Sequence, residues 1–390
     1  MVRPETASAD VVVVGGGVIG CGAAWQLAER GARVTVLERS VPGAEASSAA
    51  AGILGAQSEA DHAGPLFELS LESRKRYPAW ARALAANTGI DVEHRVSGVL
   101  RVAFDTPALR RLKAERGFQR RHGCRMEALD ARRLRRELPA LSPRLSGGLA
   151  FPDDARVDPP RLFSALRIAA ERAGVSFRTG TYVRRVASDA GRATGVVLDD
   201  GSTLPAGHVV IAAGSWSSLV EGVPLPPGGV VPARGQIVEL SLPAPPFTSV
   251  VHGPRCYLVP RDDGRVLVGS TLEFVGYRRD VTAAAVRDLL DSAIELAPAL
   301  GPASLGRTWS SFRPYTNDGL PVLGACDVRG LVLATGHHRN GILLAPVSAE
   351  IVCALVLGRR PPLALEAFSP QRRAAEPTPS SARRSRLRRA

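Results

Sequence analysis

Three glycines near the N-terminus have the spacing of a phosphate cradle. Gly15-x-Gly17-x-x-Gly20 follows four valines and precedes a stretch with helical apolar spacing, so Val18 and Ile19 would begin a helix. The first glycine permits a tight turn, the second lets the backbone approach a pyrophosphate, and the third lets the helix pack on the strand. The helix N-terminus also presents free N–H groups and a partial positive charge. The motif therefore predicts a dinucleotide site.

A carboxylate stands at the end of the next predicted strand, residues 33–37. This residue, Glu38, can accept hydrogen bonds from an adenosine ribose, and it would repel a 2′-phosphate, which disfavours NADP. Strand, helix, second strand and acid together indicate one β-α-β unit. The glycines and the acid do not by themselves distinguish FAD from NAD.

The elements that must position this cradle recur along the chain. A buried strand followed by glycine is predicted at residues 11–17, again at 208–214 and again at 331–336. Helices are predicted at residues 66–88, at 107–140 as surface helices, at 282–298 and from about 341 to 358. We expect one domain with a parallel sheet, assembled from all three strand-glycine segments and interrupted twice by a domain rich in antiparallel strands.

Composition excludes several classes of function. The net charge of +13 comes almost entirely from arginine, and residues 371–390 hold seven arginines against one glutamate. We interpret the charge as a composition bias plus a disordered tail, so nucleic acid is an unlikely partner. The uncharged stretch 11–28 contains five glycines and predicts a strand, turn and helix, not a membrane span. No signal peptide is expected. Five scattered cysteines without metal-ligand spacing favour a reducing cytoplasm and no metal.

Six further blocks occur in the order typical of one flavoprotein family. They are Ser47–Leu54, Arg234–Gln236, Tyr257–Arg261, Gly269–Thr271, Phe312–Pro321 and Ala334–Pro346. From Val11 to about Phe368 the chain resembles the D-amino-acid-oxidase-like FAD oxidoreductases. Within that family it is most similar to the branch that oxidises glycine for thiamine biosynthesis.

The resemblance implies an α/β fold with a Rossmann-like FAD-binding domain of the glutathione-reductase type and an α+β substrate domain with an antiparallel sheet. The expected FAD-binding domain is discontinuous (1–90, 150–220 and 315–368), the substrate domain comprises 91–149 and 221–314, and 369–390 is the disordered tail. FAD should be bound non-covalently. The residues expected to contact it are Gly15, Gly17, Val18, Ile19, Gly20, Glu38, Arg39, Ala46, Ser47, Ala51, Gly52, Ile53, Val183, Gly214, Gly336, His337, His338, Arg339, Asn340, Gly341, Ile342 and Leu343.

The last of these blocks also has a physical interpretation. Gly336 ends a predicted strand, and the helix that starts near Gly341 would aim its N–H groups at the negative charge of reduced flavin. Pro346 would fall near the first turn of that helix, where a missing N–H costs least.

The resemblance assigns the substrate site to Arg313, Tyr257 and Arg339. The planar guanidinium of Arg313 can hold a carboxylate with two parallel hydrogen bonds, and no catalytic acid or base is required because the flavin does the chemistry. The implied reaction is oxidation of glycine, or of a small amine or D-amino acid, to the imine and the 2-oxo acid, with oxygen reduced to hydrogen peroxide. Thiazole synthase is an implied partner, and a homo-oligomer is expected. Leu272, Arg255 and His338 depart from the family pattern, which leaves substrate preference open.

Three alternatives remain at this point. The chain could be another oxidase or dehydrogenase of the same family, acting on sarcosine, D-alanine or D-proline. A related oxidase domain acts on modified tRNA, although this chain lacks the methyltransferase domain found with it. The third alternative is an FAD-binding scaffold without redox activity, which no amine would bleach.

Overall fold

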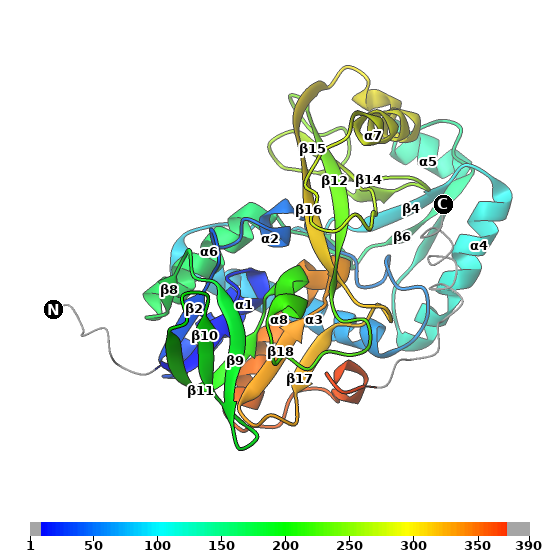
Figure 1. Cartoon of the computed structure of the whole chain (residues 1–390). Coiled ribbons are helices and arrows are strands. Elements are labelled where there is room, and N and C mark those ends of the chain that lie inside the picture. Colours follow the sequence, from blue (N-terminus) through cyan, green and yellow to red (C-terminus); the bar gives the residue numbers. More distant parts are fainter. Residues whose placement is uncertain (1–8, 373–390) are drawn as a thin grey trace.

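The computed structural model describes residues 9–372 and contains two large β-sheets that lie in different parts of the molecule (Figure 1). The first sheet has the strand order β17 (Val322–Ala325), β18 (Leu331–Thr335), β11 (Thr203–Ile211), β1 (Ala9–Val14), β2 (Val34–Leu37) and β8 (Ser176–Arg178), with β10 (Arg192–Leu198) beside β11 and β9 (Val183–Asp189) beside β10.

Parallel pairing brings the three predicted strand-glycine segments together. β1 lies between β11 and β2, and β11 pairs with β18 on its other side, all in parallel register. The carboxyl ends of these strands therefore meet at one edge, where Gly15, Gly214 and Gly336 follow them. The prediction of one sheet built from distant segments is confirmed, and ligands of open α/β sheets bind at such an edge.

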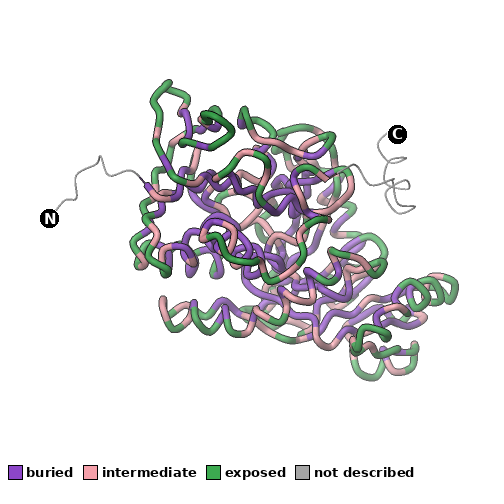
Figure 2. Tube along the Cα trace, turned by 90° about the horizontal axis from the view of Figure 1, so that it is seen from below, coloured by how far each residue is buried: buried purple, intermediate pink, exposed green. Residues whose placement is uncertain are grey.

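Both faces of the central strand are buried, which explains why its sequence is an unbroken run of valines. Val11 and Val13 face a core shared with α1 (Val18–Ala28), α3 (Pro65–Thr88), α6 (Pro159–Arg172) and α8 (Gly341–Val356). Val12 and Val14 face a second core that includes residues of β9, β10 and β11. Buried segments accordingly run through the middle of the molecule, and exposed segments form its outer loops (Figure 2).

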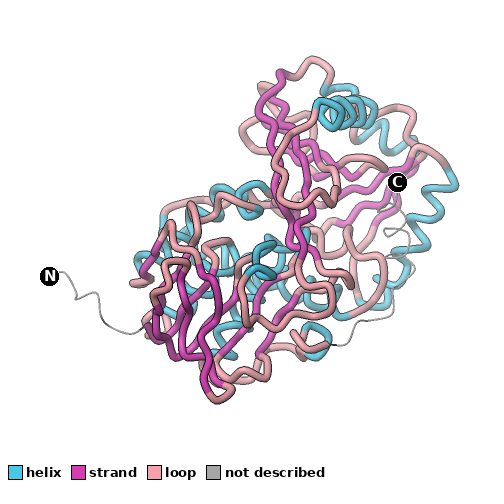
Figure 3. Tube along the Cα trace, viewed as in Figure 1, coloured by secondary structure: helices cyan, strands magenta, loops and turns pink. Residues whose placement is uncertain are grey.

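The second sheet is largely antiparallel and carries its helices on one side (Figure 3). Its order is β16 (Ser304–Tyr315), β12 (Val231–Ser241), β15 (Arg265–Gly269), β14 (Tyr257–Pro260), β13 (Val250–His252), β4 (Val99–Ala103), β6 (Gly147–Phe151) and β5 (Glu127–Asp130). The helices are α4 (Thr106–Arg116), α5 (Ala131–Glu137) and α7 (Ala283–Leu296). β5 interrupts the stretch 107–140 that was predicted to be helical, because Leu129 is the one buried position of a short strand that completes the sheet edge.

Short elements connect the two sheets. α2 (Ala46–Ala49) precedes β3 (Ile53–Leu54), which pairs with β7 (Ala155–Arg156). Every strand of the first sheet falls in the ranges predicted for the FAD-binding domain. The second sheet falls in the predicted substrate domain, apart from the ends of β6 and β16. We therefore propose that the chain has these two domains, one for FAD and one for the substrate.

The C-terminal helix α8 is apolar and central. The stretch His338–Val356 has the length and hydropathy of a membrane span, but 67% of it is buried inside the molecule, as in the core helix of a globular fold. Pro346 is the sixth residue of α8, so its predicted place near the first turn is wrong. Its missing N–H frees the carbonyl of Ile342, and that carbonyl accepts a hydrogen bond from the Tyr77 hydroxyl at 2.8 Å.

The predicted tail, 369–390, begins inside the described part of the chain. Arg372 is 7% exposed at its side chain and forms an ion pair with Asp318 at 2.7 Å. The rest of the predicted tail, 373–390, lies outside the described residues.

Candidate active site

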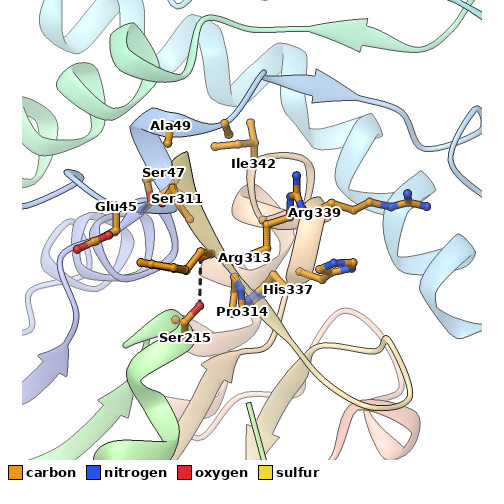
Figure 4. A pocket seen from close by; sticks show the side chains of 18 of the residues that line it. Glu45, Ser47, Ala49, Ser215, Ser311, Arg313, Pro314, His337, Arg339 and Ile342 are labelled. Carbon is orange, nitrogen blue, oxygen red and sulfur yellow. Dashed lines mark hydrogen bonds between the residues drawn. The ribbon is translucent and has the colours of Figure 1, made fainter. Parts of the chain in front are cut away.

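A cavity of about 550 Å³ lies between the carboxyl edge of the first sheet and one face of the second. The glycine motif, the segment after β2, the end of β11 and the start of α8 line it from one side, and strands β12, β14, β15 and β16 line it from the other. Figure 4 shows side chains from both sides around this space, among them Ser47, Ser215, Arg313 and Arg339. Its shape joins a long cofactor groove to a smaller substrate pocket.

The glycine motif leaves room for a phosphate because side chains are impossible there. Gly15 has a φ of +107°, and a Cβ at this position would stand 2.5 Å from the carbonyl oxygen of Ala212. A Cβ on Gly20 would overlap the carbonyl oxygen of Gly15, so Gly20 permits the close packing of α1 on β1. Gly17 is the N-cap of α1 and offers no side chain to its N–H groups. The Val18 N–H is instead bound by the Ser47 hydroxyl at 2.9 Å.

The adenosine end of the cavity carries the predicted acid. Glu38 accepts hydrogen bonds from the N–H groups of Gly16 at 2.9 Å and Ser40 at 3.0 Å, which fix its carboxylate at the groove. Arg39 forms an ion pair with Glu45 and lies over the ring of Trp216, 3.9 Å from the centroid. Trp216 lines the cavity but was missed, because its only signal is a place two residues after Gly214.

The other end of the groove is closed by the start of α8. His337 is buried and exchanges a hydrogen bond with the Ser348 hydroxyl at 2.9 Å, and burial lowers the pKa of its imidazole to about 4. The imidazole is therefore neutral at physiological pH. Gly341 and Ile342, the first residues of α8, line the cavity. This helix end has no side-chain cap, and the N-terminus of a helix carries a partial positive charge.

The residues of the cradle fit FAD. The cavity passes from the fixed carboxylate of Glu38, past a helix N-terminus suited to pyrophosphate, to a second helix N-terminus suited to negative charge on a ring. The cavity wall at Gly52 is packed closely against the segment that follows β7, because a Cβ on Gly52 would overlap the carbonyl oxygen of Val157. The loop is further held by Arg261, which is 1% exposed and donates to the carbonyls of Ala51 and Val157 at 2.7 and 2.6 Å.

Arg313 is the cation of the substrate end. It stands on β16 and donates to the Ser270 hydroxyl at 2.5 Å and to the Thr271 carbonyl at 3.1 Å, which orients its guanidinium toward the cavity. Burial lowers its pKa, and the neighbouring Tyr257 opposes that effect. Gly235 makes space for it, because a Cβ there would stand 2.6 Å from Arg313 Cζ.

Tyr257 belongs to a row of side chains that crosses the second sheet. Arg101 on β4 is the register partner of His252 on β13, His252 pairs with Tyr257 on β14, and Tyr257 pairs with Gly269 on β15. Directly paired residues project from the same face, and three of these four line the cavity. Burial raises the pKa of Tyr257, so its hydroxyl stays protonated. Gly269 leaves room for the Tyr257 ring, because a Cβ on this glycine would stand 2.6 Å from Cε2 of the tyrosine.

Arg339 is not an isolated cation in the described chain. Its Nε lies 2.9 Å from an oxygen of Glu59, whose side chain is 14% exposed. Glu59 lines the same cavity and carried no signal in the sequence, because it stands in the irregular segment between β3 and α3. At the rim, Arg255 pairs with Glu295 at 2.5 Å.

The structure brings most of the predicted site residues to this cavity. Those that line it are Gly15, Gly17, Val18, Ile19, Glu38, Arg39, Ala46, Ser47, Ala51, Gly52, Ile53, Val183, Gly214, Tyr257, Arg313, His337, His338, Arg339, Gly341 and Ile342. Four others do not line it: Gly20, Gly336, Asn340 and Leu343. Gly336, with a φ of +71°, turns the chain from β18 toward α8, and Leu343 is buried in the core beneath that helix. Their assignment as FAD contacts stays a prediction.

Comparison with known proteins agrees with this geometry. A family model described as DAO, FAD dependent oxidoreductase, matches residues 10–355. The glycine oxidase of Geobacillus kaustophilus (strain HTA426) is 38% identical over 367 residues, which cover 92% of this chain and 96% of that protein. The bifunctional protein ThiO/ThiG of Synechocystis sp. (strain ATCC 27184 / PCC 6803 / Kazusa) is 39% identical over 375 residues. The chain spans about half of that longer relative, 54% of its length.

Solved structures resemble the whole described fold. The crystal structure of glycine oxidase from Geobacillus kaustophilus has a TM-score of 0.90 and 38% identity, with 95% of this chain and 100% of that chain covered. The crystal structure of iminodiacetate oxidase (IdaA) from Chelativorans sp. BNC1 has a TM-score of 0.84 and 27% identity, with 94% and 100% covered.

Proposed function

This chain belongs to the FAD dependent oxidoreductase family, and we propose that within this family it is an oxidase that acts on glycine. FAD held by the glycine motif, Glu38 and the start of α8 would supply the acceptor for a hydride from the carbon that bears the amine, and O2 would take up the two electrons as hydrogen peroxide. The substrate becomes an imine, which water hydrolyses to glyoxylate and ammonia. The predicted non-covalent attachment of FAD is part of this proposal.

One observation carries the choice of substrate. Four arginines among the described residues line the cavity, and three of them have a carboxylate partner within 4.0 Å: Arg39, Arg255 and Arg339. Within residues 9–372 the fourth, Arg313, has none, and the hydrogen bonds that it donates there go to neutral oxygens. A buried cation without a counter-ion is costly, so it favours a ligand that brings one carboxylate. An amino acid with a small side chain meets that requirement.

The chain's own residues would orient this substrate. The fork of Arg313 takes both carboxylate oxygens, and the protonated Tyr257 hydroxyl donates a further hydrogen bond from β14, on the same sheet. His337 stays neutral in the groove and adds no charge that would compete for the carboxylate. Fixing the acid end in this way restricts the amine-bearing carbon to one position, which is the contribution that proximity makes to rate.

Flavin bleaching tests the proposal directly. We expect the purified protein to be yellow and to lose its flavin absorbance anaerobically on addition of glycine, with sarcosine, D-alanine and D-proline reacting less completely or more slowly. Peroxide formed on admitting air distinguishes an oxidase from a dehydrogenase. A colourless protein that takes up no FAD, or a yellow one that glycine does not bleach, contradicts the proposal.

The variant Arg313→Leu gives a matched test of the carboxylate site. Loss of a charge-assisted contact of about 1.5–3 kcal/mol corresponds to a rise in KM for glycine of about 10- to 100-fold. FAD content should not change, because Arg313 lies at the substrate end. An unchanged KM would remove Arg313 from this role.

A place in thiamine biosynthesis is the remaining part of the proposal. The bifunctional ThiO/ThiG relatives join a region similar to this chain to a further part within one polypeptide. We propose that the imine made here is used by a thiazole synthase, that the chain works in the cytoplasm, and that it forms a homo-oligomer. Co-purification of a thiazole synthase from cells that express both proteins would support the link, and light scattering of the pure protein measures the oligomer.

A further inference from the structure

A carboxylate in the substrate pocket has no role in the proposed reaction. Glu59 lines the cavity, its side chain is 14% exposed, and Oε2 lies 2.9 Å from Arg339 Nε. The same oxygen is buried and has no hydrogen bond of good geometry within residues 9–372. This carboxylate therefore faces a ligand cavity and is paired with one cation. A buried charge in that position can decide the net charge of the ligands that bind there.

A buried network of hydrogen bonds and an ion pair fixes the backbone that leads to Glu59. Asp154 is fully buried and accepts hydrogen bonds from the N–H groups of Gln57 at 3.1 Å and Ser58 at 2.8 Å. Arg74 pairs with that aspartate at 3.0 Å. Arg101, on the neighbouring strand β4, donates to the carbonyl of Ser58 at 2.8 Å. The two residues before Glu59 are therefore fixed from three sides.

Arg339 lines the pocket beside Glu59, and Arg101, which is not part of the lining, lies against the backbone just before Glu59. Burial and the charges of Arg116 and Arg339 lower the pKa of Arg101 to about 10, while Asp61 and Glu59 oppose this effect. The charge of Arg339 also lowers the pKa of Arg313. Arg101 has no carboxylate within 4.0 Å in the described chain. Figure 4 shows Arg313 and Arg339 around the one cavity. Without Glu59, the pocket would present Arg339, backed by Arg101, as a second site for an anion.

We propose that Glu59 sets the substrate class of this site. Its carboxylate neutralises Arg339, so the pocket takes amines that carry one carboxylate and rejects those that carry a second. This inference rests on the proposed function, because it assumes that Arg313 binds the first carboxylate. A second carboxylate would have to displace Glu59 from Arg339 or lie beside it, and like charges in a partly buried pocket repel strongly.

The test compares a monoanion with a dianion of similar size. Acetate and malonate are titrated into the FAD-containing protein, and binding is followed both by the change in flavin absorbance and by the shift in unfolding temperature. We expect wild type to bind malonate at least tenfold more weakly than acetate. In Glu59→Gln the malonate-to-acetate affinity ratio should rise about tenfold or more, and the variant should oxidise iminodiacetate, a glycine with a second carboxymethyl group on nitrogen.

A matched control separates this effect from a simple gain of positive charge. Glu295→Gln also releases a cavity-lining arginine, Arg255, from its ion pair. Arg255 lies at the rim of the cavity, whereas Arg339 lies in the substrate pocket. We expect that variant to change the ratio less than threefold. The double variant Glu59→Gln/Arg339→Gln should lose the gain, because the second carboxylate then has no cation. If Glu59→Gln does not retain FAD, Glu59→Asp withdraws the carboxylate by one methylene and should raise the ratio by a smaller factor.

The outcomes distinguish the two proposals. An unchanged ratio in Glu59→Gln, or an equal gain in Glu295→Gln, overturns the role of Glu59 even if glycine is oxidised normally. A shifted ratio in a protein whose wild type does not oxidise glycine would support the role of Glu59 and contradict the proposed function alone.

Discussion

Gly235→Ala tests the substrate site without removing any of its functional groups. Gly235 lies on β12 beside Arg313, and a Cβ at this position would stand 2.6 Å from Arg313 Cζ, whereas ordinary contact begins at 3.4 Å. The nearest guanidinium atom, Nη2, would stand only 2.1 Å from that Cβ, so the guanidinium must retreat by at least 3.4 − 2.1 = 1.3 Å. Hydrogen bonds span only about 0.5 Å in length, so the fork cannot keep both bonds to a carboxylate at its present place.

The expected magnitude follows from that loss. One charge-assisted hydrogen bond contributes about 1.5–3 kcal/mol, which corresponds to a rise of roughly 10- to 100-fold in KM for glycine. Affinity for acetate should fall by the same factor, because acetate uses only the carboxylate contacts. Steady-state kinetics with peroxide detection gives KM, and acetate titration gives the binding constant. FAD content should match wild type.

The control is a glycine with free space around it. A Cβ on Gly117 would meet nothing within 4 Å, so Gly117→Ala should leave KM and acetate affinity within about twofold of wild type. If Gly235→Ala also stays within twofold of wild type while retaining FAD, the packing of Arg313 over this glycine does not position it, and the reasoning is refuted.

Three further outcomes are expected. Gly15→Ala should lower FAD affinity at least about tenfold, because its φ of +107° and the carbonyl beside it exclude a side chain; flavin content equal to wild type after gel filtration would contradict this. Asp154→Ala should lower the free energy of unfolding by about 2–4 kcal/mol, because it leaves Arg74 and two backbone N–H groups without this acceptor; urea unfolding measures this, with Asp291→Ala, at an exposed position of α7, as a control expected to change it little. Burial lowers the pKa of His337 from 6.5 to about 4. As the pH falls, the unfolded chain therefore binds this proton at a higher pH than the folded chain does, and stability is lost below pH 6.5. The loss from this group is about 2 kcal/mol at pH 5, and His337→Gln should show a shallower fall of unfolding temperature between pH 7 and 5; equal slopes would assign the fall to other groups.

Much of the cofactor site could be predicted from the sequence because its determinants are local. Gly15, Gly17 and Gly20 act through their own backbone angles and through contacts with the strand and helix beside them. Glu38 bonds N–H groups of Gly16 and Ser40, and Gly16 belongs to the same β-α-β unit. Such a unit carries its geometry within about thirty residues, so its spacing in the chain is enough to indicate a dinucleotide cradle.

The substrate end is different because its members come from strands that are distant in the chain. Gly235 and Gly269 stand in recognisable blocks, but only the register of β12, β14, β15 and β16 reveals that one makes room for Arg313 and the other for Tyr257. Arg339 was expected to meet the substrate, and its ion pair with Glu59, 280 residues earlier in the numbering, depends on how β3 and α8 approach each other.

The sequence by itself determined the glycine cradle, the parallel sheet built from three separated strands, and the arginine for a carboxylate. The cradle and the sheet are set by short-range backbone geometry and by hydrophobic periodicity, whereas Arg313 was assigned through the resemblance of its block to a known family. Only the tertiary structure decided which charges are paired. Among residues 9–372 it leaves Arg313 without a counter-ion and joins Arg339 to Glu59. It also places the Tyr77 hydroxyl on the carbonyl that Pro346 frees. Charge pairing and hydrogen-bond satisfaction depend on distances of a few ångströms between remote segments, and no local pattern in the chain records those distances.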